Sequence, residues 1–595
     1  MRKGKRIALL ALAVVAISVA GATAAFAGDN DSGFKTSQPS MLSCPSCGRN
    51  IVPILTVGDT LPGGYRFEAI PDGISIRARG NGRADLFVNH ETSTVAFQYV
   101  TAGPTAANSQ NDFDNAQVSL LGLNQHSKGA LFGSYAIGSD ENYQRFCSNY
   151  LATEREGFDR EIFFTNEEGQ DYVNRTGTAW SQTIAAGTAG AEQIGVVVAY
   201  DPQNGKHKTI YGMGRHNHEN NVAIPGFENL VMLSGDDTFF TTPQGAPYNQ
   251  KAFSQLYSYI APDTDAVWND TGSLYAFVSD TAGFNDYFDF DPLAATPQSI
   301  SGHFIKVPTD VVLADGHHGN VATGKKDNGA ELRYSDFTGM LPPPTASGIP
   351  DGPQWVLDQW GNKSINGEGQ VFRFVRIEDI AYDKRPGMSN VVYLADSGRA
   401  TAGAAAKDRS TNGRIWKMVL NADDPTKVDS LSILVEGDNN PTAVTNPTLA
   451  LGEIHQPDNV ETTANGSLLV QEDPSGNNNY PPAGAPTTAA RLWKVNLNAT
   501  TPDQSKEAVA SVDQSSDEGP TDADVSPTGA LGSWESSGVV DASSIWGAGW
   551  FLVTVQAHTL WVDVAPGPDV VAPAGPDWTF KREGGQLLAI KIPGA

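Results

Sequence analysis

Short apolar runs alternate along the chain with turns rich in Gly, Asn, Asp and Pro. The runs are rich in Val, Ile, Phe, Tyr and Trp, and they show almost no helical periodicity. Many short runs of this kind, separated by turn residues, are typical of an all-β fold. The pattern therefore predicts a chain built almost entirely of strands.

A weak internal repeat groups these runs in pairs. The first run of a pair ends in small or acidic residues, and the second carries an apolar or aromatic pair. The pairs are 162–165 with 195–200, 391–396 with 413–419, 468–472 with 491–495, 551–555 with 586–591, 230–233 with 256–260, and 274–278 with 303–307. Radial repetition of such units makes a propeller. We therefore expect a six-bladed β-propeller in one domain over residues 61–595, with a pair of β-sandwiches as the alternative.

Three segments stand outside this repeat. Residues 1–27 combine a basic start, an apolar stretch and a small-x-small pattern before Gly28, which predicts a cleaved secretory signal and a secreted protein; a membrane anchor is the alternative. Residues 28–60 contain a Ser/Gly/Pro-rich stretch and are expected to form a flexible leader. Residues 315–369 are rich in Gly, Pro, Lys and Asp, and form a long excursion between blades, either a lid or a solvated loop.

The net charge of the chain limits the classes of molecule that it can bind. The formal net charge is −27, and such a surface repels nucleic acid and anionic membranes. Oxygen-rich acidic surfaces suit hard cations such as calcium. We expect a monomer that acts on a small molecule.

Cysteines are few. Cys44 and Cys47 form a single C-x-x-C pair, and Cys147 is left over. One pair does not supply a four-cysteine zinc site, whereas an oxidising compartment would permit a local disulfide. Disulfide and metal binding both remain open for this pair.

Charged clusters stand where the apolar runs begin or end. They are Asn89-His90-Glu91, Asn166-Glu167-Glu168, Arg215 to Asn220, Gly235-Asp236-Asp237, Arg376-Ile377-Glu378-Asp379, Gln456 to Asn459, Gln471-Glu472-Asp473, Trp534-Glu535 and Gln556-Ala557-His558. Loops of a propeller converge on its axis, and carboxylates gathered there repel one another unless cations neutralise them. Any one cluster fits an ordinary acidic turn, but their recurrence predicts a site for several cations.

Two further patterns bear on the chemistry. His216 and His218 lie two apart, so on a strand they share a face and could both ligate a metal, or they are hydrogen-bonded surface groups. No G-x-S-x-G elbow, phosphate-binding P-loop or dinucleotide fingerprint is present. The common serine hydrolases and nucleotide enzymes are therefore excluded.

These clusters, in this order, resemble the PhoX-type alkaline phosphatases over roughly residues 62–592. The matching motifs are Asn89-His90-Glu91, Gly214-Arg215 through His218-Glu219, Gly235-Asp236-Asp237, Arg376-Ile377-Glu378-Asp379-Ile380, Gln456-Pro457-Asp458-Asn459 and Gln556-Ala557-His558. The resemblance implies a six-bladed propeller that hydrolyses phosphate monoesters with the help of ferric and calcium ions.

The resemblance also assigns roles to residues. It implies that Arg376 and Glu378 are catalytic, in contact with the phosphate and the metals, and that Glu219 is a metal ligand. The family's T-C-E-E motif corresponds to Thr165-Asn166-Glu167-Glu168, so Asn166 replaces the cysteine that binds iron. A neutral amide oxygen favours calcium or magnesium over iron at that position.

The hypothesis is therefore a secreted, metal-dependent phosphatase with calcium as its main cation and iron less favoured. The candidate metal ligands are Glu91, Glu167, Glu168, Glu219, Asp236, Glu378, Asp458, Glu472 and Glu535. Two alternatives stay open. One is a non-catalytic propeller stabilised by calcium, and the other is a different hydrolase on the same scaffold, such as a phosphodiesterase or a lactonase.

Overall fold

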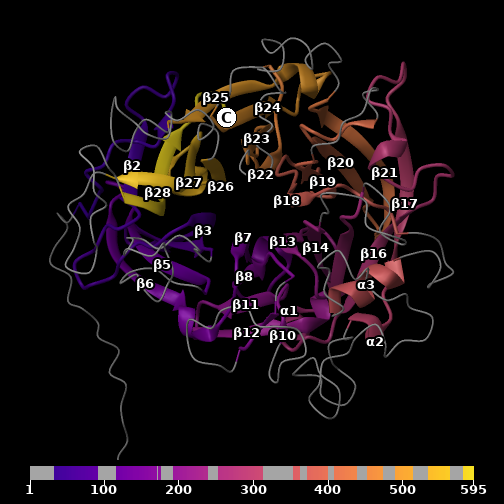
Figure 1. Ribbon diagram of the computed structural model, residues 1–595, viewed down its shortest axis with the longest axis horizontal. Coiled ribbons are helices and arrows are strands. Elements are labelled where there is room, and N and C mark those ends of the chain that lie inside the picture. The colour runs from indigo at the N-terminus through magenta and orange to yellow at the C-terminus, as the bar shows by residue number, and fades with distance from the viewer. Residues whose placement is uncertain are drawn as a thin grey trace, which may run out of the picture.

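The chain folds into an all-β, propeller-like ring of sheets (Figure 1). The computed structural model describes residues 32–91, 115–170, 172–175, 192–238, 252–312, 353–361, 371–399, 408–438, 452–473, 489–513, 534–562 and 580–595. The predicted secretory signal lies outside these residues. None of the helices within them has the length and apolar character that crossing a membrane requires.

Four sheets contain four or five antiparallel strands each. The first comprises β3 (Pro71–Gly80), β4 (Arg83–His90), β5 (Gln117–Asn124) and β6 (Ala130–Ile137), and the second comprises β7 (Phe146–Ala152), β8 (Ile162–Glu167), β11 (Val197–Asp201) and β12 (Lys206–Ile210). The third comprises β22 (Pro457–Thr462), β23 (Ser467–Glu472), β24 (Arg491–Asn496), β25 (Glu507–Val512) and β1 (Leu42–Ser43). The fourth comprises β26 (Glu535–Asp541), β27 (Trp550–Val562), β28 (Phe580–Lys591) and β2 (Ile51–Thr56).

A further sheet has nine strands. Its order is β13 (His218–Ile224), β14 (Leu230–Asp236), β15 (Leu256–Ala261), β16 (Ser273–Ser279), β17 (Ser299–Lys306), β21 (Asp424–Glu436), β20 (Arg414–Asn421), β19 (Val391–Asp396) and β18 (Ile377–Tyr382). Strands β9 (Tyr172–Val173) and β10 (Glu192–Gln193) form a separate short ladder. The helices are short: α1 (Thr264–Trp268), α2 (Thr309–Val312), α3 (Pro353–Gly361) and α6 (Ser543–Trp546).

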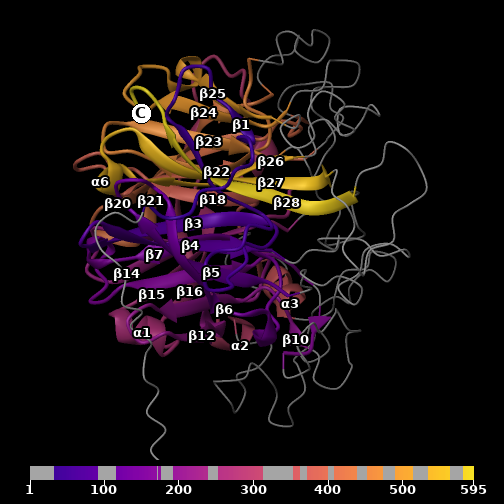
Figure 2. The same cartoon turned by 90° about the vertical axis from the view of Figure 1, so that its left-hand side faces the viewer.

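The innermost strands surround the centre of the ring. Figure 1 shows β3, β7, β13, β18, β22 and β26 around it, and each of them contacts the next, with β26 contacting β3. Figure 2 shows the ring from its side, with the strands β3 to β6 across the front. All these innermost strands begin toward the same end of the axis, so their first residues come close together.

The hydrophobic core lies between neighbouring sheets. Phe87 of β4 stacks on Phe163 of β8 with ring centroids 4.6 Å apart, and both side chains are fully buried. Sheets covered on both faces need apolar residues on both sides of each strand. Strand β23, for example, is buried at every position. This explains why the sequence shows continuous apolar runs instead of strict alternation.

The six predicted strand pairs are all hydrogen-bonded neighbours. Their assignment to six blades was wrong in one respect. The pairs 230–233 with 256–260 and 274–278 with 303–307 lie in the same nine-stranded sheet, and the sheet β3 to β6 was not among the pairs. Hairpins inside a sheet and connections between sheets have similar signatures, so the repeat identified neighbours without marking where one sheet ends.

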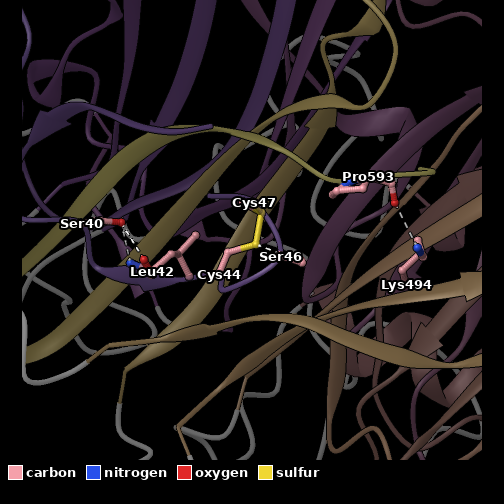
Figure 3. Close-up of a disulfide and its surroundings, with 7 residues drawn as sticks. All are labelled: Ser40, Leu42, Cys44, Ser46, Cys47, Lys494 and Pro593. Carbon is pink, nitrogen blue, oxygen red and sulfur yellow. Dashed lines mark hydrogen bonds between the residues drawn. A yellow bond between two sulfur atoms is a disulfide. The ribbon is translucent and has the colours of Figure 1, made fainter. Parts of the chain in front are cut away.

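The expected flexible leader is instead part of the sheets from residue 42 onward. Strand β1 pairs with β25, and β2 pairs with β28. Between them Cys44 and Cys47 form a disulfide in the core next to β24 and β27 (Figure 3). The N-terminal segment thus joins the last two sheets of the ring. Of the predicted excursion over 315–369, only α3 is described, so the lid interpretation lies outside the described residues.

We expect Leu55→Ala to destabilise the protein, because this residue ties the N-terminal segment to the last sheet. Leu55 is fully buried on β2 and lies opposite Leu587 of β28. Loss of a buried leucine costs about 2–5 kcal/mol. Urea unfolding of the variant measures the loss, and Val52→Ala, at a partly buried position of the same strand, is the control and should lose less. Equal stability of Leu55→Ala and the wild type would contradict the role of β2.

Candidate metal centre

The innermost strands carry the same irregularity near their first residues. In β3, β7, β13, β18 and β22, two residues oppose one on the second strand, directly after the first paired residue. Such a β-bulge bends a strand and re-aims its side chains. The residues immediately after that first pair are Asp72, Cys147, Glu219, Glu378 and Asp458. Each of these five strands therefore presents one acidic or thiol side chain at an equivalent place.

These side chains form a connected series of potential metal-binding groups. Within each group the ligand atoms lie within 4.8 Å of one another. The groups are Asp72, Glu91 and Cys147; Cys147, Glu168 and Glu219; Glu219, Glu378 and Asp458; and Asp458, Asp473 and Glu535. Consecutive groups share Cys147, Glu219 and Asp458, so the groups join into one acidic centre at the ring axis. We call this set of residues the axial cluster.

Polar neighbours fix the orientation of the axial cluster. The Cys147 thiol donates to Asp72 Oδ2 at 2.7 Å, and the Ser148 hydroxyl donates to Glu219 Oε1 at 2.9 Å. Gln556, from the late motif of the sequence, donates from Nε2 to Glu91 Oε1 at 2.9 Å and to Glu535 Oε1 at 3.2 Å. These contacts hold the side chains in place although their charges repel.

Burial and mutual repulsion shift the ionisation of the axial cluster. Burial raises the pKa of Glu219 well above its usual value, and the carboxylates of Glu168 and Glu378 raise it further. Burial likewise raises the pKa of Asp458, with Glu378 and Glu219 adding to the effect. Burial also raises the pKa of the Cys147 thiol. Carboxylates this close cannot all be ionised unless positive charge lies between them.

One arginine lies among these carboxylates. Arg376 donates from Nε and Nη2 to the two oxygens of Asp237 at 2.6 and 2.7 Å, and its Nη2 lies 3.0 Å from Glu378 Oε1. Both carboxylates and the arginine are buried, and Asp237 and Glu378 raise the pKa of Arg376 against the effect of burial. The paired contact with Asp237 fixes the plane of the guanidinium group.

Three predicted ligands lie outside the axial cluster. Glu167 accepts from the Arg175 guanidinium at 2.6 and 2.8 Å and from the Gln144 amide at 2.9 Å. Glu472 accepts from the Arg491 amide at 2.8 Å and the Trp493 indole at 2.7 Å. Asp236 accepts from Thr238. Each is the last residue of its strand, β8, β23 or β14. For Glu167 and Glu472 the next residue, Glu168 or Asp473, belongs to the axial cluster.

The axial cluster contains three residues that the sequence analysis did not name as ligands: Asp72, Cys147 and Asp473. Asp72 and Asp458 are each followed by a turn-favouring residue, Gly73 and Asn459, which is a usable signal for the bulge. The sequence analysis named Glu472 as a metal ligand instead of its neighbour Asp473. Cys147 carried no local motif.

Asn166 lies close to Cys147 but is not part of the axial cluster. Strand β8, which contains Asn166, pairs with β7, which contains Cys147. The Asn166 amide donates to the carbonyl oxygen of Ser148 at 3.1 Å. Cys147 thus places a thiol in the same region, on the strand adjacent to Asn166.

Comparisons with known proteins agree with this arrangement. A family model described as "Alkaline phosphatase PhoX" matches residues 133–521, well over half of the chain. The structure of Pseudomonas fluorescens PhoX in complex with vanadate, a transition-state analogue, is 15% identical, with a TM-score of 0.50, covering 94% of this chain and 97% of that one. A Trichoderma reesei enzyme of carbohydrate-active family AA12, in an iodide structure, is 13% identical with a TM-score of 0.30 over 74% of this chain and 97% of that one. No curated protein sequence matches the chain.

Carboxylates inside and outside the axial cluster should respond differently to substitution. Asp458→Asn should weaken calcium binding at least about 10-fold, since even partners that only orient a ligand contribute that much. Glu472→Gln should leave calcium binding unchanged but lower stability by about 3 kcal/mol, because it breaks a buried ion pair with Arg491. Calorimetric calcium titration and urea unfolding of both variants check this, and a reversed outcome would contradict the assignment.

Proposed function

The chain belongs to the PhoX family of alkaline phosphatases, and from that premise we propose that it is a secreted, metal-dependent hydrolase of phosphate monoesters. Family membership supports a phosphatase-type hydrolase. The observation that carries the finer proposal is the position of Arg376, buried beside a series of carboxylates that could hold cations. Cations and arginine together are what recognition of a phosphate group requires.

The donor atoms of the axial cluster fit metal cations. Eight of its nine residues offer carboxylate oxygens, the ligands that calcium prefers. Asp458 Oδ1 is buried and has no hydrogen-bond partner among the described residues, as expected for an oxygen reserved for a cation. We propose Asp72, Glu91, Cys147, Glu168, Glu219, Glu378, Asp458, Asp473 and Glu535 as ligands of this site, and remove Glu167, Asp236 and Glu472 from its set.

Cys147 changes the proposal on iron. The sequence analysis disfavoured iron because Asn166 stands where the family has a cysteine. Cys147 belongs to two of the potential metal-binding groups, and a deprotonated thiol is a soft ligand that iron accepts and calcium does not. We therefore propose a mixed site, with calcium at the carboxylate groups and iron beside Cys147.

The roles of the protein groups follow from their contacts. Bound cations would supply positive charge to the phosphoryl oxygens and offset the charge that develops during hydrolysis. Asp237 fixes the Arg376 guanidinium through its Nε and Nη2 atoms, and we assign that guanidinium to the phosphoryl group. Ser397 donates to Glu378 Oε1 and so keeps that carboxylate at the axis. Glu378 orients both Arg376 and the neighbouring cation.

The architecture belongs to the proposal as well. Strands β13 to β16 and β18 to β21 each repeat the strand order and the bulge of the other sheets, which supports dividing the nine-stranded sheet into two blades. That division makes six blades in one domain over residues 61–595, with β1 and β2 added from the preceding segment. The Cys44–Cys47 disulfide fits the oxidising compartment that the predicted signal implies. A monomer remains our proposal for the oligomeric state.

Arg376→Ala should lower turnover of a chromogenic phosphate monoester by about 100-fold, the cost of removing one preorganised donor to transition-state charge. Arg376→Lys keeps the buried positive charge and should still lose about 10-fold, because lysine lacks the planar fork. The control is Arg385→Ala, which removes an ion pair with Asp383 at the opposite end of β18. Wild-type turnover in Arg376→Ala would overturn the proposal, and turnover of a diester or a lactone instead would replace it with one of the alternatives.

Cys147→Ser should separate the two classes of cation. The variant keeps the size of the side chain but replaces a soft sulfur by a hard oxygen, so bound iron should fall to background while calcium is retained. Metal analysis by mass spectrometry of the purified protein measures both. Iron content equal to that of the wild type would exclude Cys147 as an iron ligand.

A further inference from the structure

His216 and His218 occupy different environments although they lie two residues apart. His218 is hydrogen-bonded through both ring nitrogens, to Ser234 Oγ at 2.7 Å and to the Gly214 carbonyl oxygen at 3.1 Å. His216 is also fully buried, but neither of its nitrogens has a hydrogen-bond partner in the described part of the chain. Its ring lies between those of His218, 3.5 Å away, and Tyr257, 4.6 Å away.

Asp236 lies close to this histidine and has an oxygen of its own that is unpartnered within the described residues. Asp236 is fully buried, and its Oδ1 accepts from Thr238 while its Oδ2 has no partner among the described residues. Gln354, on α3, donates from Nε2 to Asp236 Oδ1 at 3.4 Å, and its own Oε1 is buried without a partner. The distance from His216 Nδ1 to Asp236 Oδ1 is 4.0 Å.

Leaving these atoms unpaired would be costly. A neutral imidazole has one N–H donor and one lone pair, and each buried group without a partner costs about 1–3 kcal/mol. A separation of 4.0 Å is too long for a hydrogen bond. It can, however, be spanned by a cation bound at about 2 Å from each ligand atom. Burial lowers the pKa of His216 well below its usual value, so the imidazole is neutral and its lone pair can bind a metal.

We propose that His216, Asp236 and Gln354 form a second metal site, separate from the axial cluster, that binds a borderline divalent cation of the zinc class. An imidazole nitrogen combined with oxygen ligands suits zinc, whereas the groups of the axial cluster contain no histidine and suit harder cations. The residue after Asp236 is Asp237, which holds Arg376. A cation here would therefore join the ends of β13 and β14 to α3, next to the phosphate-binding arginine.

The proposal is tested on the full chain, with zinc and cobalt(II) as probes in the presence of saturating calcium. After dialysis, the wild type should retain one zinc ion more than His216→Gln, and calcium content should be equal in both. Cobalt(II) should give the visible absorption of a nitrogen-ligated ion in the wild type, and this absorption should be lost in His216→Gln. The control is His303→Gln, since His303 is an exposed histidine hydrogen-bonded to Asp280 at 2.7 Å. None of these readouts depends on phosphatase activity.

Equal zinc retention by His216→Gln and the wild type, or no zinc retention by the wild type, would overturn the proposal. If His216→Gln does not fold, Gln354→Ala provides the same test, because Gln354 lies on a helix outside the sheets. Its zinc affinity should be about 10-fold weaker than that of the wild type. Unchanged zinc affinity in a folded Gln354→Ala protein would also overturn the proposal.

Discussion

Repulsion between buried carboxylates at the ring axis is the constraint on which the site depends. Each of the five larger sheets contributes an acidic or thiol side chain there, and Glu219, Glu378 and Asp458 lie within one group of potential ligands. Their mutual repulsion and their burial both favour the protonated form. Arg376 offsets part of the negative charge, but it is already held by Asp237 and Glu378. Bound cations would allow these carboxylates to be ionised together.

The same sheets also contain a second set of buried acids, whose oxygens are held by hydrogen bonds within the protein. Glu167, Asp396 and Glu472 each end the second strand of a sheet, and backbone amides or arginines occupy their oxygens. The next residue in the chain points the other way, because side chains alternate along a strand. A shift of one residue therefore separates Glu167 and Glu472 from Glu168 and Asp473, which belong to the axial cluster.

Much of the fold could be predicted from the sequence. Of the site, only the residues that stand in recognisable local motifs could be predicted. The apolar runs identified strand pairs correctly, because blade strands are buried on both faces. Sheet boundaries and the role of residues 42–56 could not be derived, since both depend on pairing with residues far away in the chain. Glu91, Glu168, Glu219, Glu378, Asp458 and Glu535 were named from acids that cluster at strand ends, and they lie together in the axial cluster. Cys147 was not, because its proximity to Asp72 and Glu219 arises only when β7 packs between β3 and β13.

The dependence of phosphatase activity on cations tests the account most directly. The purified chain would be assayed with a chromogenic phosphate monoester before and after dialysis against a chelator, and again after calcium and iron are restored. The account predicts turnover that is lost with the chelator and regained when the metals return, in a protein that stays folded at the working pH. Turnover unaffected by complete metal removal, or no turnover in the fully metal-loaded protein, would contradict it.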